Sequence, residues 1–186
     1  MAGCQPAGNT GTTTPPQSAK QTVYFSVSDP GILEHISMLE MTISKVSVHN
    51  AESDSWTDVM TEERTVDLLA LKESYAKELL GQISVDPSTY NQIRLDVAKV
   101  MATYNGESME AKLPSNVLKM NVQLAVSSDP LLVNLDILSE ESLHATGEGQ
   151  VIMTPVIKIE KHIGVQVEKE GKNIRVKSQK EKEEET

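Results

Sequence analysis

The chain has 186 residues, and its 17 Lys and Arg against 27 Asp and Glu give a formal net charge of −10. No apolar run reaches the ~18 residues that a membrane-spanning helix needs. The single cysteine excludes an internal disulfide framework and a multi-cysteine zinc site. The acidic balance opposes non-specific nucleic-acid binding, which depends on neutralising phosphates with Lys and Arg, so we expect no nucleic-acid partner.

The N-terminal segment predicts a disordered tether. Residues 1–20 are rich in Gly, Thr, Pro, Ser and Gln, so they cannot bury enough apolar surface to offset their ordering entropy. Ala2-Gly3-Cys4 resembles the end of a prokaryotic lipobox, in which two small residues precede the cysteine that is lipidated. We therefore expect lipidation at Cys4, contact with a membrane through that lipid, and an export signal that the chain as given lacks. The alternative is a chance match in the disordered tail of a cytosolic protein.

Strand patterns dominate the middle of the chain. Residues 22–28 alternate strictly, with Val23, Phe25 and Val27 on one face, as in a half-buried strand. Further strands are predicted at residues 40–49, 91–104, 108–113, 117–126, 131–138 and 150–160. Together these predict an all-β, antiparallel β-sandwich of about seven or eight strands.

Three local signals refine these strands. The apolar phase slips at Ser44 and again at Ala98, which predicts a β-bulge in each strand. Asn105-Gly106 predicts a type I′ hairpin, because both residues tolerate positive φ. Pro155 lacks a donor for the ladder, so the strand that contains it is predicted to lie at an edge or to be bulged there.

One short helix is predicted near residues 72–80. Asp67 can cap the segment, and Gly81 stands at the C′ position. The apolar residues at helical spacing are Leu68, Leu71, Tyr75 and Leu79.

The predicted organisation has three parts: a tether over residues 1–20, a β-sandwich domain over 21–160 and an extension over 161–186. Residues 163–176 of the extension form either a terminal hairpin or a linker, because isolated hairpins are marginally stable. The charged residues that follow predict a solvated tail.

Several segments together carry a family resemblance. They are Val27-Ser28-Asp29-Pro30, residues 43–51, Trp56-Thr57-Asp58-Val59, residues 67–71, residues 90–95, residues 118–120, Leu135-Asp136, residues 145–149 and residues 153–157. In this order they resemble domain-of-unknown-function family 4382, over about residues 21–160. The resemblance implies a secreted or lipid-anchored prokaryotic protein whose β-sandwich is immunoglobulin-like or transthyretin-like. It implies no activity.

Candidates for chemistry are few. The four histidines show no metal-ligand spacing, and the Gly-x-Ser-x-Gly nucleophile elbow is absent. Glu62-Glu63, Glu140-Glu141 and the Asp-Pro corners could supply calcium ligands, but without EF-hand spacing we expect a solvated surface, no metal and no cofactor. Asp136 is predicted to pair with Arg94 in a structural ion pair.

Trp56 is the main candidate for ligand contact. It follows a turn-like stretch and could be an exposed platform for a sugar, although the only Trp of a small β domain is more often part of the core. The sequence favours a non-enzymatic, lipid-anchored surface or periplasmic module that acts by binding or as a structural element. The alternative is a carbohydrate- or calcium-dependent ligand-binding module, and the remote alternative is a hydrolase with two carboxylates in a cleft. The protein or glycan partner is left open.

Overall fold

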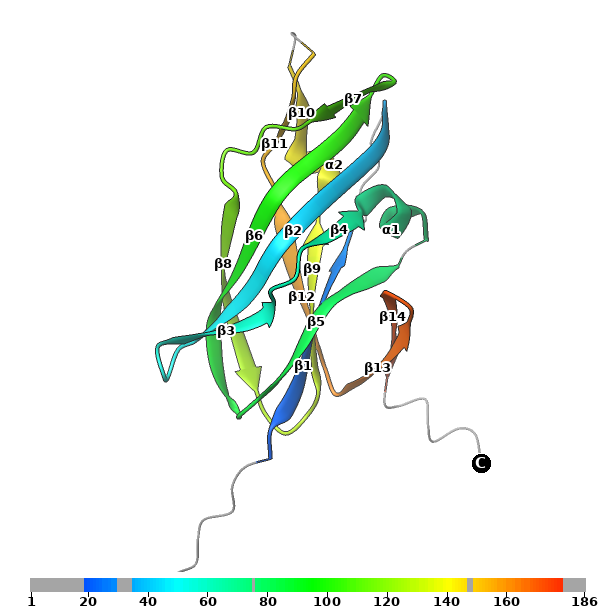
Figure 1. Ribbon diagram of the computed structural model, residues 1–186. Coiled ribbons are helices and arrows are strands. Elements are labelled where there is room, and N and C mark those ends of the chain that lie inside the picture. The colour runs from blue at the N-terminus through cyan, green and yellow to red at the C-terminus, as the bar shows by residue number, and fades with distance from the viewer. Residues whose placement is uncertain (1–18, 30–34, 75, 147–148, 179–186) are drawn as a thin grey trace, which may run out of the picture.

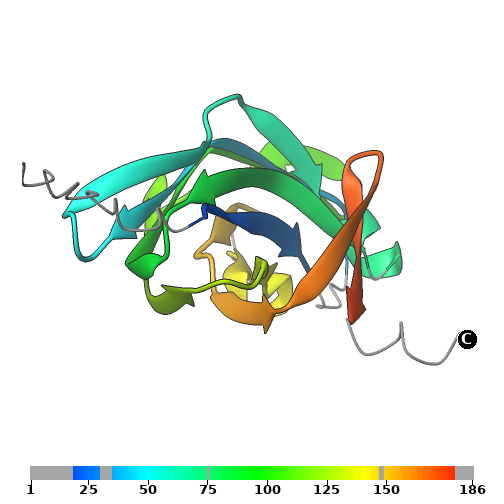
Figure 2. The same cartoon turned by 90° about the horizontal axis from the view of Figure 1, so that it is seen from below.

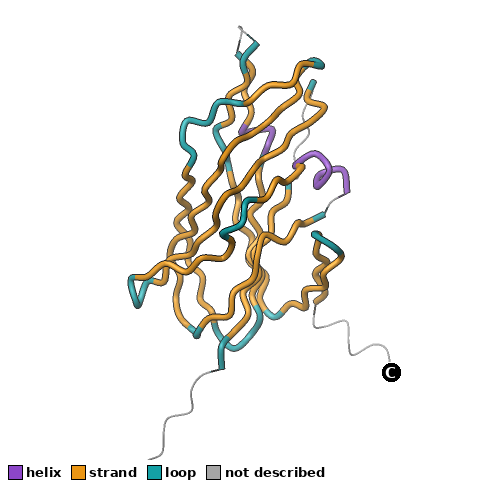
Figure 3. Tube along the Cα trace, in the orientation of Figure 1, coloured by secondary structure: helices purple, strands orange, loops and turns teal. Residues whose placement is uncertain are grey.

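The computed structural model describes residues 19–29, 35–74, 76–146 and 149–178. This part of the chain forms fourteen strands and two short helices, and strands make up most of it (Figures 1 and 3). Neither helix is long and apolar enough to cross a membrane. The described residues include the whole predicted sandwich except for short gaps, whereas Cys4, most of the predicted tether and the end of the charged tail lie outside them.

The first sheet has six strands, and one neighbouring pair in it, β1 and β9, is parallel. Across the sheet the order is β12 (Ile157–Ile163), β9 (Leu131–Ile137), β1 (Gln21–Ser28), β5 (Lys77–Val85), β14 (Asn173–Ser178) and β13 (Val165–Glu170). Val23, Phe25 and Val27 of β1 are buried in the core, as their alternation predicted.

The second sheet is built on two long antiparallel strands. These are β2 (Ile36–Asn50) and β6 (Ser88–Tyr104), and they pair with β3 (Ser55–Met60), β4 (Arg64–Asp67), β7 (Glu107–Glu110) and β8 (Val117–Val126). The register of the β2–β6 ladder shifts at Ser44 and at Ala98, so both predicted bulges are confirmed. Asn105 and Gly106 have φ of 50° and 85° and connect β6 to β7, so the predicted hairpin is confirmed as well.

The two sheets enclose one continuous hydrophobic core. Figure 2 shows the two layers from below, with β1 beneath β2 and β6. Phe25, Leu39, Leu95 and Leu135 are each at most 1% exposed and come from strands of both sheets. A small separate ladder pairs β10 (Leu143–Ala145) with β11 (Val151–Met153), after the four-residue helix α2 (Ser139–Ser142).

The prediction of one helix near residues 72–80 is wrong in position and number. Helix α1 spans Leu68–Ser74, and the chain then enters β5. The Asp67 carboxylate accepts a hydrogen bond from the Ala70 amide at 3.0 Å, so the predicted cap is present but starts the helix earlier. Gly81 lies inside β5 rather than at a helix end. The pairing of β5 with β1 outweighs the helical spacing of the leucines.

The predicted strand count and the purely antiparallel arrangement are also wrong. The described residues form fourteen strands rather than seven or eight, because β2 and β6 each pair with several short partners. The predicted strand 150–160 divides around Pro155 into β11 and β12, which belong to different sheets. β12 is an edge strand of the first sheet, in agreement with the prediction from proline.

Residues 163–176 adopt the hairpin alternative. β13 and β14 pair over six positions, and β14 continues onto β5. Only Gly164, with φ of 69°, separates β12 at one edge of the sheet from β13 at the other. The sheet must therefore curl, and β13 also contacts β9. This curl explains why Ser26 and Asn134, which point away from the main core, are 0% exposed.

Candidate functional site

A chain of polar side chains lies on the outer face of β1 and β9. Ser26 Oγ donates a hydrogen bond to Asn134 Oδ1 at 2.9 Å, and Asn134 Nδ2 donates to Ser28 Oγ at 2.8 Å. Ser28 Oγ donates to Asp136 Oδ1 at 2.5 Å. All four residues are at most 9% exposed. The register explains their meeting, because Ser26 pairs with Asn134 and Ser28 with Asp136 across the parallel ladder.

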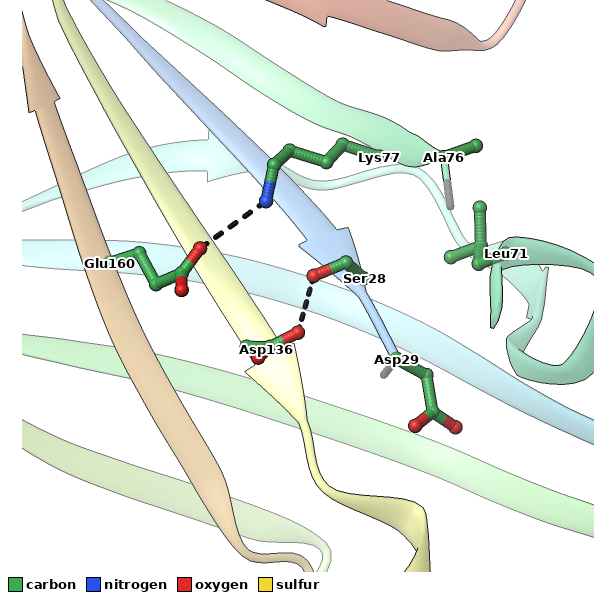
Figure 4. Close-up of a pocket in the computed structure, with 7 residues that line it drawn as sticks. All are labelled: Ser28, Asp29, Leu71, Ala76, Lys77, Asp136 and Glu160. Atoms are coloured by element: carbon green, nitrogen blue, oxygen red, sulfur yellow. Dashed lines mark hydrogen bonds and ion pairs between the residues drawn. The ribbon is translucent and has the colours of Figure 1, made fainter. Parts of the chain in front are cut away.

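A pocket of about 210 Å³ opens beside the end of this network (Figure 4). It is lined by Ser28, Asp29, Leu71, Ala76, Lys77, Asp136 and Glu160. These residues come from β1, α1, β5, β9 and β12 and from the segments that join them. The lining therefore combines three carboxyl groups, one ammonium group and one hydroxyl group with a small apolar wall.

Glu160 is the most highly connected acid of the pocket. Its Oε2 lies 3.3 Å from Lys77 Nζ and accepts a hydrogen bond from Asn134 Nδ2 at 3.3 Å, and its Oε1 lies 3.3 Å from Lys158 Nζ. Burial alone raises the pKa of this carboxyl, but the charge of Lys77 and the three hydrogen bonds outweigh burial, so the pKa lies below its usual 4.5. Glu160 is therefore held as a carboxylate, which does not suit a general acid.

The predicted ion pair between Arg94 and Asp136 is wrong. Asp136 is bonded to Ser28 in the first sheet, whereas Arg94 Nε lies 2.9 Å from Asp96 Oδ1 on the second. Arg94 and Asp96 stand two residues apart on one face of β6, so their side chains meet on that face. The hydrophobic core separates this face from Asp136.

The structure overturns the expectation that Trp56 belongs to the core. Trp56 is 45% exposed on β3. Its ring lies 5.0 Å from the ring of His49, measured between centroids, at an interplanar angle of 53°. His49 Nδ1 is 2.8 Å from Asn91 Oδ1, and His49 Nε2 is 3.1 Å from Asp54 Oδ1. The indole thus contacts the imidazole of His49 and remains partly exposed to solvent.

The other candidates do not converge on a metal centre. Glu62, Glu63, Glu140 and Glu141 are exposed. Among the described residues, no group of three or more His, Cys, Asp or Glu is placed to hold a metal ion. Cys4, the predicted lipidation site, lies outside the described residues.

The pocket was not predicted from the sequence. Ser28 and Asp136 are 108 positions apart, and only the parallel pairing of β1 with β9 brings them together. A weak signal was available, because polar residues stand at alternate positions of two otherwise apolar strands: Ser26 and Ser28 in β1, Asn134 and Asp136 in β9. Such residues in a doubly buried strand need partners on the same face.

Comparison with known proteins gives one match. The family model described as "Domain of unknown function (DUF4382)" matches residues 20–155. No curated protein and no solved structure matches the chain. The match includes four polar pocket residues, Ser28, Asp29, Lys77 and Asp136, whereas Glu160 and the β13–β14 hairpin lie beyond it.

Proposed function

The chain belongs to the DUF4382 family of domains of unknown function, and from this membership we propose that it is an exported, lipid-anchored, non-enzymatic module that works by binding. In this proposal its β-rich architecture is a sandwich of the immunoglobulin-like or transthyretin-like kind, tethered to the membrane through a lipid on Cys4. The tether holds the acidic domain away from the anionic lipid surface, which repels it.

One observation carries the proposal that the module binds rather than only supports. The only Trp of the chain is 45% exposed on the outer face of a sheet, instead of filling the core. Trp combines a large apolar surface with a polar N–H, and exposed Trp is enriched where proteins bind partners. With 45% of its surface exposed, the indole keeps apolar area that a bound partner would remove from water.

The pocket favours structure over catalysis. A hydrolase with two carboxyl groups needs one of them protonated as the general acid, which requires a raised pKa. Burial raises the pKa of Glu160, but Lys77 and the hydrogen bonds lower it by more, so the net shift is downward. The hydroxyl of Ser28 donates its hydrogen bond to Asp136, not to a histidine that could activate it as a nucleophile. These side chains hold the ends of β1, β9 and β12 together.

The start of β1, which follows the proposed tether, lies toward the same end of the domain as the loop that leads to Trp56. Gln21, at the start of β1, pairs with Val85, just before the turn into β6. Across that turn, Ser88 Oγ donates to Asn50 Oδ1 at 3.2 Å, at the start of the loop that leads to Trp56. In a protein tethered at its N-terminus, the exposed indole would face components near the membrane surface.

The anchor is tested by expressing the gene with its native upstream segment and partitioning the product between detergent and aqueous phases. We expect the wild type to enter the detergent phase and a Cys4→Ala variant to remain aqueous. Thr12→Ala, a substitution in the same tether, is the matched control and should partition as wild type. A wild type that stays aqueous, or a Cys4→Ala variant that still enters detergent, would refute the anchor at Cys4.

A further inference from the structure

Four side chains form one row across the outer face of the second sheet. In the antiparallel register Trp56 of β3 pairs with His49 of β2, His49 pairs with Gln92 of β6, and Gln92 pairs with Asn121 of β8. Directly paired residues of antiparallel strands point to the same face. Their neighbours Val48 and Ile93 are buried in the core, so the row points outward. Figure 1 shows these four strands side by side.

The aromatic end of the row is held rigidly. The indole contacts the His49 ring, and Asn91 and Asp54 each bond to one ring nitrogen of the imidazole. Asn91 reaches His49 because the β2–β6 register shifts between His49 and Asn50, where Asn91 is the extra residue of β6 and lies on the surface. Such a shift in a ladder re-aims a side chain, often at a binding site.

The other end of the row carries two carboxamides. Gln92 Nε2 donates to Asn121 Oδ1 at 3.1 Å. This bond fixes both amides and uses only part of their capacity, because each carboxamide has two donor hydrogens and an oxygen with two lone pairs. Donors and acceptors therefore remain available at the end of the row away from the indole, two and three strands along the sheet from Trp56.

The charges around the row are balanced. On the same face Lys45 Nζ lies 2.9 Å from Asp58 Oδ1, and Arg94 Nε lies 2.9 Å from Asp96 Oδ1. The chain as a whole carries −10, but this face carries both signs, because Lys119 pairs with Arg94 in the register and Asp54 borders the row beside His49. Its charge therefore complements a neutral partner rather than a polyanion or a basic peptide.

We infer that this row binds a neutral oligosaccharide, which names the ligand class of the binding module proposed above and rests on that proposal. The exposed part of the Trp56 indole packs against the C–H face of a sugar ring. Gln92 and Asn121 exchange hydrogen bonds with hydroxyl groups of the sugars that follow, and Asp54 accepts from a hydroxyl at the rim. Four adjacent strands at ~4.8 Å spacing make the row ~14 Å long, which is the length of a short oligosaccharide rather than of one sugar.

The first test is a titration of the 186-residue chain with cellohexaose, chitohexaose and mannohexaose, and with polygalacturonate as the anionic comparison. Because Trp56 is the only Trp, its emission reports directly on the site. We expect at least one neutral hexasaccharide at millimolar concentration to shift this emission to shorter wavelength. The matching disaccharide should bind ~10-fold more weakly, because it leaves part of the row unoccupied.

Variants are compared by calorimetry, since Trp56→Ala removes the fluorophore. Trp56→Ala should weaken binding at least ~10-fold, and Gln92→Ala and Asn121→Ala each ~3- to 10-fold, as expected for one lost hydrogen bond. Gln82→Ala is the matched control, because Gln82 is an exposed amide on β5 of the other sheet. It should bind as wild type. Circular dichroism of each variant checks that the fold is intact.

Three outcomes would overturn the inference. The first is that no neutral hexasaccharide changes the emission or releases heat, or that only polygalacturonate does. The second is that Trp56→Ala, Gln92→Ala and Asn121→Ala bind as tightly as wild type. The third is that sedimentation shows a dimer that Trp56→Ala dissociates, since the row would then be an interface between two copies of the chain. None of these depends on Cys4, so failure here is distinguishable from failure of the lipid anchor.

Discussion

Ser44 of β2 and Ala98 of β6 are the extra residues of two register shifts that flank a single pair, Ile43 and Val97, in the ladder between these strands. On either side of this pair the ladder has the same register, so the two shifts compensate each other. Each shift also moves the apolar phase of its own strand, so that residues on both sides of it still face the core.

This arrangement predicts that Ser44 can be deleted at small cost. Every pair of the β2–β6 ladder would survive the deletion, and the main loss is the bond from Ser44 Oγ to the Asp96 carbonyl, 3.1 Å long. We expect the free energy of unfolding to fall by ~1–2 kcal/mol. Deleting Ser47, which pairs with Arg94 in a regular stretch, would turn Val48 away from the core and should prevent folding. Urea unfolding followed by circular dichroism compares the two, and equal losses would contradict the assignment.

Asn134 is predicted to contribute most of the stability of the polar network, because its side chain bonds to three other residues. Its side chain accepts from Ser26 and donates to Ser28 and to Glu160. Asn134→Leu keeps the volume but leaves the buried Ser26 hydroxyl without its partner, at a cost of ~1–3 kcal/mol, and removes one bond each from Ser28 and Glu160. We expect a loss of ~2–4 kcal/mol in unfolding free energy, against at most ~0.5 kcal/mol for the exposed Asn121→Ala. A loss below ~1 kcal/mol in urea titrations would show that the network contributes little.

Features that depend on neighbouring residues were predictable from the sequence. The alternation in β1, the phase slips at Ser44 and Ala98, and the turn at Asn105-Gly106 were all read correctly because each is specified by local backbone chemistry. Pro155 likewise indicated an interruption, because it separates β11 from β12, and β12 is an edge strand. Such signals require no knowledge of which strands become neighbours.

Features that depend on distant pairing were not predictable. The leucines before Gly81 have helical spacing, but the pairing of β5 with β1 and β14 draws residues 77–85 into a strand. The pocket joins Ser28 to Asp136 across a parallel ladder, and no local pattern indicates that β1 would pair with β9. The exposure of Trp56 depends on β3 lying at the edge of the second sheet, which its sequence neighbours do not specify.

Gly81 is predicted to be required because of space rather than because of its dihedral angles. A Cβ atom at this position would lie 2.5 Å from the backbone oxygen of Val59, where β5 of the first sheet approaches β3 of the second. The obstacle is backbone, so it cannot rotate away, and Gly81→Ala should cost ~1–3 kcal/mol through overpacking. Ser84→Ala, at an exposed site of the same strand, is the control and should change stability little. Thermal unfolding of the two variants measures the difference, and a Gly81→Ala protein as stable as the control would contradict the close approach.

The lowered pKa of Glu160 predicts that the free energy of unfolding depends on pH. Lys77 and the hydrogen bonds to Glu160 outweigh burial and lower its pKa in the folded state below the usual 4.5. The unfolded chain therefore binds the proton more readily, so this group stabilises the fold above its unfolded pKa, and the stabilisation is lost as pH falls through the folded pKa. We expect the unfolding free energy to decrease as the pH falls from the usual pKa of 4.5 through the lower pKa of the folded state. Lys77→Met removes the charge that lowers the pKa of Glu160 and should flatten this part of the profile, whereas Lys99→Met, at an exposed site on the other sheet, should leave it unchanged. Urea titrations at a series of pH values measure both profiles, and an unaltered slope in Lys77→Met would show that the ion pair does not hold Glu160 in its charged form.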